Sequence, residues 1–136
     1  MPIDIECVLE VKESDIWVGT DELNNLSIFA GADSDLIFGI NKVPSLDSIA
    51  GNKGLPSDIS NYTNQLLDSF KEFGKKENNF NLFGFSYLSY FDVLNMNLFN
   101  HIDESSIWYK IFNLMELQKT KGYKEQNIRI VVWSHW

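Results

Sequence analysis

The stretch Ile128-Arg129-Ile130-Val131-Val132-Trp133, near the end of the chain, decides the fold class. Its side chains are apolar except that of Arg129, and β-branched residues dominate, which is typical of a strand buried on both faces. We therefore expect this segment to lie in the centre of a sheet. Because an unpaired buried guanidinium costs too much free energy, Arg129 must be paired, either with an acid such as Asp4 or Glu6 or with a bound anion.

The first strand of the sheet is expected at the other end of the chain. Apolar and mainly polar side chains alternate over residues 3–12, which predicts a half-buried strand with Cys7 facing inward. Residues 13–14 can turn the chain into a second strand over residues 15–20, with Trp17 on the opposite face from its two apolar neighbours. The acids expected on the solvent face of the first strand are Asp4, Glu6 and Glu10.

Between these strands the sequence predicts helices and one long loop. Apolar residues at helical spacing, preceded by polar residues that can cap the first turn, predict four helices. They cover residues 22–31 capped by Asp21, residues 59–73 capped by Ser57 or Asp58 and closed by Gly74, residues 87–94, and a last helix from a cap at Asp103 or Ser105 to about Lys119. Residues 80–85 are expected as a strand, and residues 32–56 as a long loop of the kind that often carries a binding surface.

Together these elements predict an α+β fold. We expect an antiparallel or mixed sheet formed by the N-terminal hairpin and the C-terminal strand, with about three to four helices packed on it. The chain has 136 residues, of which 44% are hydrophobic, and this suits one core. A single domain over residues 1–136 is therefore expected.

The composition of the chain limits its partners. The formal net charge is -8 and Arg129 is the only arginine, so nucleic-acid binding is not expected. Cys7 is the only cysteine, which excludes an internal disulfide. No charged segment followed by an apolar run opens the sequence, and no stretch approaches the roughly 20 apolar residues of a membrane helix. We expect a cytoplasmic protein without membrane contact.

Residues suited to catalysis or metal binding are sparse. His101 and His135 are the only histidines, and their spacing places neither beside a nucleophile and an orienting acid, so both are expected at the surface. Asp33-Ser34-Asp35 begins like a calcium loop but lacks the Gly and Glu at the required spacing. We therefore expect no catalytic residue, no metal and no cofactor.

Five residues are candidates for holding a small anionic ligand: Lys53, Gly54, Phe85, Tyr87 and Arg129. Backbone N–H groups around Gly54 could surround an anion, although turn chemistry favours a simple turn before the next helix. Phe85 and Tyr87 could stack on a base, although such side chains more often belong to a core. Arg129 would hold the anion if no acid pairs with it.

Short motifs along the chain resemble one protein family. They are Pro2-Ile3-Asp4-Ile5-Glu6, Leu26-Ser27-Ile28-Phe29-Ala30-Gly31, Lys53-Gly54-Leu55-Pro56-Ser57-Asp58-Ile59-Ser60, Gly84-Phe85-Ser86-Tyr87-Leu88-Ser89 and Ile128-Arg129-Ile130-Val131-Val132-Trp133. This series is similar to that of small uncharacterised proteins of phages and prophages. Those proteins carry histidines where this chain has Glu6 and the segment Gly84-Phe85. The resemblance implies a phage origin, hence the host cytoplasm, and no particular activity.

Three functions stay open from the sequence. The first is a non-enzymatic binding module of phage type that sequesters a small anionic, nucleotide-derived signal of host defence. The second is an acidic inhibitor that occupies the basic surface of a host nucleic-acid-binding protein. An enzyme has the least support. A homo-oligomer would be compatible with an exposed Trp17 on an edge hairpin.

Overall fold

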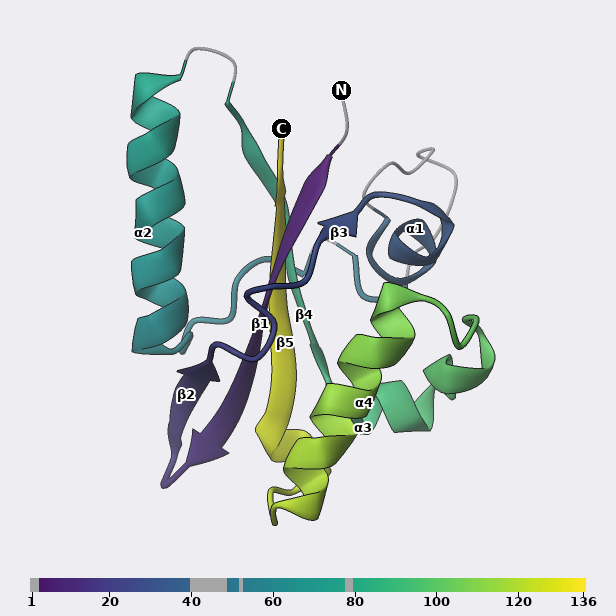
Figure 1. The fold of residues 1–136 in the computed structure, drawn as a ribbon. Helices are drawn as coiled ribbons and strands as arrows, with labels where there is room; N and C mark the ends of the chain where they lie inside the picture. The colour runs from purple at the N-terminus through teal and green to yellow at the C-terminus, as the bar shows by residue number, and fades with distance from the viewer. Residues whose placement is uncertain (1–2, 40–48, 52, 78–79) are drawn as a thin grey trace.

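The computed structural model describes residues 3–39, 49–51, 53–77 and 80–136, and its strands form one antiparallel sheet (Figure 1). The strands are β1 (Asp4–Glu13), β2 (Ile16–Thr20), β3 (Ile28–Phe29), β4 (Leu82–Ser89) and β5 (Ile128–His135). Their order in the sheet is β2-β1-β5-β4, and β3 pairs with the start of β1. The N-terminal hairpin and the C-terminal strand therefore share one sheet, as predicted.

β5 is the central strand that its apolar sequence predicts. It lies between β1 and β4, and every residue from Ile128 to Ser134 is buried. Val131 and Trp133 pack into a core on one face of the sheet, while Ile130 and Val132 pack into a larger core on the other.

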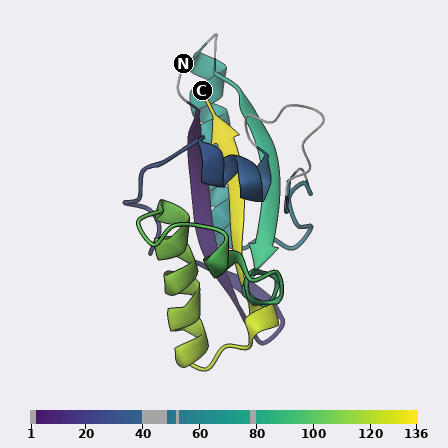
Figure 2. The ribbon, with the colours of Figure 1, turned by 90° about the vertical axis from the view of Figure 1, so that its right-hand side faces the viewer.

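Helices cover both faces of the sheet (Figures 1 and 2). α2 lies alone on one face, and α1, α3 and α4 lie on the other. This arrangement of a sheet and helices confirms the α+β fold. The helices are α1 (Ala32–Phe38), α2 (Asn61–Lys76), α3 (Tyr90–Asn95) and α4 (Ile107–Thr120), with short 3-10 turns η1 (Leu98–Asn100) and η2 (Glu125–Asn127).

β1 is buried on both faces, whereas its alternation predicts a half-buried strand. Cys7 faces the larger core, as expected. Val8 and Glu10 point to the opposite face and are buried as well, because α2 and the residues before it cover that face. The prediction that Glu10 belongs to a solvent-facing row of acids is therefore wrong.

No helix forms over residues 22–31. Backbone hydrogen bonds from Asn24 N to Asp21 O and from Leu26 N to Leu23 O, both 3.1 Å, close successive turns instead. β3 follows, with Ile28 opposite Ile5 of β1. Pairing with the sheet buries Ile28, and this tertiary gain outweighs the helical spacing of the local sequence.

A helix occupies the first part of the predicted loop over residues 32–56. α1 buries the side chains of Ile37 and Phe38 against the larger core. Ala50 N donates a hydrogen bond of 2.7 Å to Ile37 O, which brings the later part of this segment back to the helix. Residues 40–48 and residue 52 lie outside the described residues.

The boundaries of α2 differ from the predicted ones at both ends. Ser60 caps the helix, and its Oγ accepts a hydrogen bond of 3.0 Å from Thr63 N, so Ser57 and Asp58 are not the cap. The helix also continues through Gly74, which was expected to end it, as far as Lys76. Gly74 allows the ring of Phe80 to approach, because a Cβ on it would lie 2.7 Å from that ring.

The second half of the chain follows the prediction with shifted boundaries. β4 continues to Ser89, so Tyr87 belongs to a strand and not to the predicted helix over residues 87–94. Ser89 then caps α3 through Asp92 N at 3.1 Å. Ser106, one residue beyond the expected Ser105, caps α4.

Candidate functional site

Four of the predicted ligand residues lie together along β4. Gly54 N donates a hydrogen bond of 2.9 Å to Phe85 O, and Lys53 Nζ lies 4.9 Å from the centroid of the Tyr87 ring. Lys53 N donates to Ser86 Oγ at 3.3 Å. The backbone N–H groups expected to hold an anion therefore already bond to β4. Tyr87 and Phe85 pack against the core under α2.

Arg129, the fifth predicted residue, is engaged by acids of the protein itself. Its Nε lies 2.7 Å from Glu10 Oε1. Its Nη1 lies 3.1 Å from Asp58 Oδ1, and Nη2 donates to the Asp58 carbonyl oxygen at 3.2 Å. The guanidinium also stacks over Trp17, 3.8 Å from the ring centroid. Pairing with a neighbouring strand, one of the two alternatives left by the sequence, is what the structure shows.

The acid that pairs with Arg129 is not one of those expected. Glu10 stands directly opposite Arg129 across the β1–β5 pair, whereas Asp4 and Glu6 lie opposite the far end of β5. Glu10 is wholly buried, but the Asp58 side chain is 59% exposed. The contact with Glu10 is therefore the energetically important one, because an exposed ion pair contributes little.

Trp17 is buried, contrary to the idea of an exposed tryptophan at an oligomer interface. Its Nε1 donates to Asp58 Oδ2 at 3.1 Å. Ile16 and Val18, on the opposite face of β2 as predicted, are exposed. The proposed basis for a homo-oligomer is thereby removed.

His135 is not the surface residue that the sequence predicts. Its side chain is only 14% exposed, and Nε2 lies 3.2 Å from Glu6 Oε1. His101, in contrast, is exposed in the turn after η1. His135 escaped prediction because its burial depends on the rings of Phe70, from α2, and Phe80, which pack against it.

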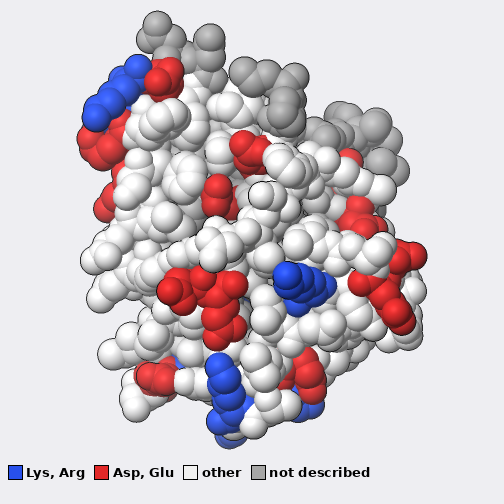
Figure 3. Space-filling view, in the orientation of Figure 1, with Lys and Arg blue, Asp and Glu red and all other residues white. Residues whose placement is uncertain are grey.

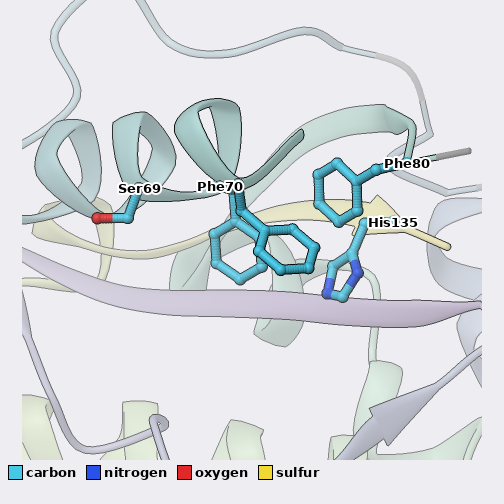
Figure 4. Close-up of a pocket in the computed structure, with 5 residues that line it drawn as sticks. Ser69, Phe70, Phe80 and His135 are labelled. Carbon is cyan, nitrogen blue, oxygen red and sulfur yellow. The ribbon is translucent and has the colours of Figure 1, made fainter. Parts of the chain in front are cut away.

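A hollow of about 360 Å³ opens beside His135, between the C-terminal half of α2 and the ends of β4 and β5 (Figure 4). The His135 ring centroid lies 5.0 Å from that of Phe70 and 5.5 Å from that of Phe80. Phe73 meets Phe80 edge to face at 5.0 Å. We call this hollow the aromatic pocket. Its lining residues are Ser69, Phe70, Phe73, Phe80 and His135.

The aromatic pocket offers ring surface and one imidazole, but its serine is not arranged as a nucleophile. Ser69 Oγ donates a hydrogen bond of 3.1 Å to Gln65 O within α2. Figure 4 shows the hydroxyl pointing away from His135. The pocket therefore has an acid–histidine contact without a serine next to it.

The remaining chemistry of the described residues is limited. No group of three or more His, Cys, Asp or Glu that could hold a metal ion is found among them, so Asp33 and Asp35 form no such site. None of the helices in that part of the chain is long and apolar enough to cross a membrane. On the face shown in Figure 3, acidic side chains form separate patches between a few lysines.

Comparisons with protein-family models, with curated proteins and with solved structures found no match to this chain. The class of protein is therefore defined by its fold and pocket: an α+β protein with one antiparallel sheet, helices on both faces and an aromatic pocket at one end of α2.

Proposed function

We propose that the protein is a non-enzymatic binding module that holds a nucleotide-derived ligand by its base in the aromatic pocket. The observation that carries the proposal is the lining of that pocket. Three phenylalanines and His135 surround a hollow of a size typical of small-ligand sites. Stacking of a base on aromatic side chains contributes about 1–3 kcal/mol per base and tolerates different bases.

Exposed aromatic surface gives the pocket a reason to bind. Phe73 is 53% exposed although it is a large apolar side chain on the rim. A flat base placed against this ring would remove apolar surface from water, at roughly 25 cal/mol for each Å² buried. The proposed site therefore differs from the segment around Lys53 and Gly54 that the sequence favoured.

Lys76 supports the anionic part of the proposal. It is exposed in the last turn of α2, seven residues after Ser69 and three after Phe73, so helical periodicity places it on the face that borders the pocket. Its neighbour Lys75 lies on another face and pairs with Glu72 at 3.0 Å. If the base of a nucleotide lies in the pocket, the phosphate on its sugar would lie near Lys76 at the rim.

The ligand is expected to be held and not altered. Ser69, the serine of the lining, bonds to its own helix, so among the described residues of the pocket no hydroxyl is arranged for attack beside His135. A protein that holds its ligand intact lowers the free concentration of that ligand. Because the sequence resembles phage proteins, we propose that the protein sequesters a nucleotide-derived signal in the cytoplasm of a host.

Calorimetric titration tests the proposal with a matched pair of variants. The ligands are the four 5′-mononucleotides, their 3′,5′-cyclic forms and the corresponding nucleosides. Phe73→Ala removes an exposed ring from the pocket, and Phe91→Ala removes a ring of similar exposure, 42%, from α3. We expect binding by the wild type and by Phe91→Ala, and at least tenfold weaker binding by Phe73→Ala.

Two further results decide the proposal. Ligand recovered after heat denaturation of the complex should be chemically intact, and recovery of a cleaved product would show an enzyme. Lys76→Gln should weaken the binding of nucleotides but not of nucleosides, whereas Lys75→Gln should change neither. If none of these ligands binds to the wild type, the proposed function is refuted.

A further inference from the structure

Independently of the aromatic pocket, we propose that the outer edge of β2 receives an extended basic segment of a partner protein as one more antiparallel strand. β2 is the outermost strand on its side of the sheet (Figure 1). The segment would carry β-branched side chains at every second position and a lysine or arginine at each end. In recognition of this kind, backbone hydrogen bonds provide affinity and the alternate side chains provide specificity.

The backbone of β2 offers hydrogen-bonding groups at this edge. Glu13 and Ile16, which flank the two-residue turn between β1 and β2, stand opposite each other and form the first hydrogen-bonded pair of the hairpin. Because hydrogen-bonded pairs alternate along an antiparallel ladder, the N–H and C=O groups of Trp17 and Gly19 point away from β1. Among the described residues, no backbone hydrogen bond reaches these groups from another part of the chain.

The side chains of β2 leave this edge unprotected. Ile16 is 67% exposed and Val18 is 40% exposed, both on the face opposite to Trp17. Natural proteins commonly protect an edge strand with a charged side chain, a proline or a bulge. β2 contains no charged residue and no proline, and its register with β1 is continuous. A partner strand would cover Ile16 and Val18 with its own β-branched side chains.

Acidic residues at both ends of β2 favour a basic partner. Asp15 directly precedes the strand and Asp21 directly follows it, and both are exposed. Neither forms a salt bridge within the described part of the chain. Lys12, on β1, extends over the ring of Trp17, 5.9 Å from its centroid, and so lies on the other face from Ile16. A lysine or arginine at each end of the added strand would therefore meet an aspartate.

A second copy of this chain fits the edge less well than a basic segment. If two β2 strands paired through Trp17 and Gly19, Val18 would stand opposite Val18 of the second copy. In that register Asp15 of each copy would stand opposite Asp21 of the other. Like charges directly opposite each other are destabilising. The acids at the ends of β2 thus oppose pairing of the protein with itself.

Short peptides with blocked ends test the proposal on the unmodified protein. When it is paired antiparallel, Lys-Val-Thr-Val-Thr-Val-Lys places its threonines opposite Trp17 and Gly19 and its valines on the face of Ile16 and Val18. N-methylation of both threonines removes the N–H groups that face β2. N-methylation of two valines removes N–H groups that face away, and this peptide is the matched control.

NMR titration of the isotope-labelled protein measures the affinity for each peptide. We expect saturable binding of the basic peptide, with slower amide hydrogen exchange at Trp17 and Gly19. The valine-methylated peptide should bind with similar affinity. The threonine-methylated peptide should bind at least about tenfold more weakly, because it lacks the two hydrogen bonds to β2.

The role of the acids is tested by removing their charges. Asp15→Asn combined with Asp21→Asn should weaken binding of the basic peptide about fivefold at low salt, the ratio expected for two cross-strand ion pairs. Asp68→Asn combined with Glu104→Gln removes the same charge from exposed positions elsewhere and should leave the affinity unchanged. The acidic peptide Glu-Val-Thr-Val-Thr-Val-Glu should bind the wild type more than about tenfold more weakly than the basic one.

The role of the edge itself is tested at Val18. Val18→Lys should weaken binding of the basic peptide about tenfold, because a lysine on an edge strand opposes the addition of another strand. Leu117→Lys is the control, since Leu117 on α4 has a similar exposure, 46%, and lies outside the sheet. This variant should bind the peptide as the wild type does.

Several results would overturn the proposal. These are the failure of the basic peptide to bind, equal binding of the two methylated peptides, and equal binding of the basic and acidic peptides. A concentration-dependent dimer that Val18→Lys disrupts would show that a second copy, and not a basic segment, occupies the edge.

Discussion

Arg129 and Glu10 face each other across the β1–β5 pair, with Nε 2.7 Å from Oε1 and side chains 7% and 0% exposed. The second oxygen of Glu10 accepts hydrogen bonds from Ser60 N at 2.9 Å and from Thr63 Oγ1 at 2.5 Å. One buried carboxylate, that of Glu10, therefore connects β1 and β5 to the start of α2. The aromatic pocket lies toward the other end of the same helix.

Glu10→Ala should be strongly destabilising. The variant leaves the guanidinium of Arg129 buried without its main counter-ion and leaves the first turn of α2 without an acceptor. We expect a loss of about 3–5 kcal/mol in the free energy of unfolding, measured by urea denaturation. Glu72→Ala, at an exposed position, should cost less than about 0.5 kcal/mol. A loss below about 1 kcal/mol for Glu10→Ala would contradict the account.

Arg129 should prove structural and not ligand-binding. Arg129→Met alone strands the buried Glu10 and should cost about 3 kcal/mol or more. The double variant Glu10→Met with Arg129→Met should lose clearly less than the sum of the two single losses, because neither charge is then left unpaired. A double-mutant cycle in urea measures this coupling, and additive losses would show that the pair does not interact.

Asp58 should make stability depend on pH in the acid range. Burial raises the pKa of Asp58, but the hydrogen bonds and charge of Arg129, with the Trp17 N–H, outweigh it and hold that pKa below its usual value. A group with a lowered folded-state pKa contributes stability above its unfolded pKa, about 3.9, and loses it as the pH falls through the folded value. Asp58→Asn should therefore be less stable than wild type at neutral pH, and the difference should close below about pH 4. Parallel curves of stability against pH would be the contrary result.

Gly19 should tolerate no side chain. A Cβ there would lie 2.6 Å from Tyr62 Cβ and 2.8 Å from Ser60 Oγ, where β2 meets the start of α2. We expect Gly19→Ala to lower the melting temperature, with a cost of about 1–3 kcal/mol. Gly31→Ala is the control, since its backbone is extended and, chain neighbours apart, no atom of the described residues lies within 4 Å of the added carbon. That variant should stay within about 1 kcal/mol of wild type, and a similar loss in both would rule out the steric explanation.

The parts of the fold that local patterns describe could be predicted. The period of two over β1 and the apolar run of β5 predicted the sheet and its central strand, and both are observed. The segment over residues 22–31 could not be predicted, because its helical spacing loses to pairing of Ile28 with β1. The burial of Glu10 was hidden as well, since it depends on which helix covers that face.

The candidate site was harder to predict than the fold. Phe70 and Phe73 lie in the helix predicted over residues 59–73, but apolar residues at helical spacing do not show which rings stay partly exposed. His135 and Glu6 come from opposite ends of the chain and meet only through the pairing of β1 with β5. The one signal in the sequence was a polar residue, His135, at the end of a buried strand. That Glu6 is its partner could be known only from the register of β1 and β5.

The most direct test of the central claim is a two-dimensional NMR titration of the isotope-labelled protein with each of the four 5′-mononucleotides. The account predicts that the largest shift changes fall on the lining of the aromatic pocket, at Phe70, Phe73, Phe80 and His135, and that they saturate with ligand concentration. Shift changes confined to Lys53, Gly54 and Tyr87, or no changes with any of the four nucleotides, would contradict it.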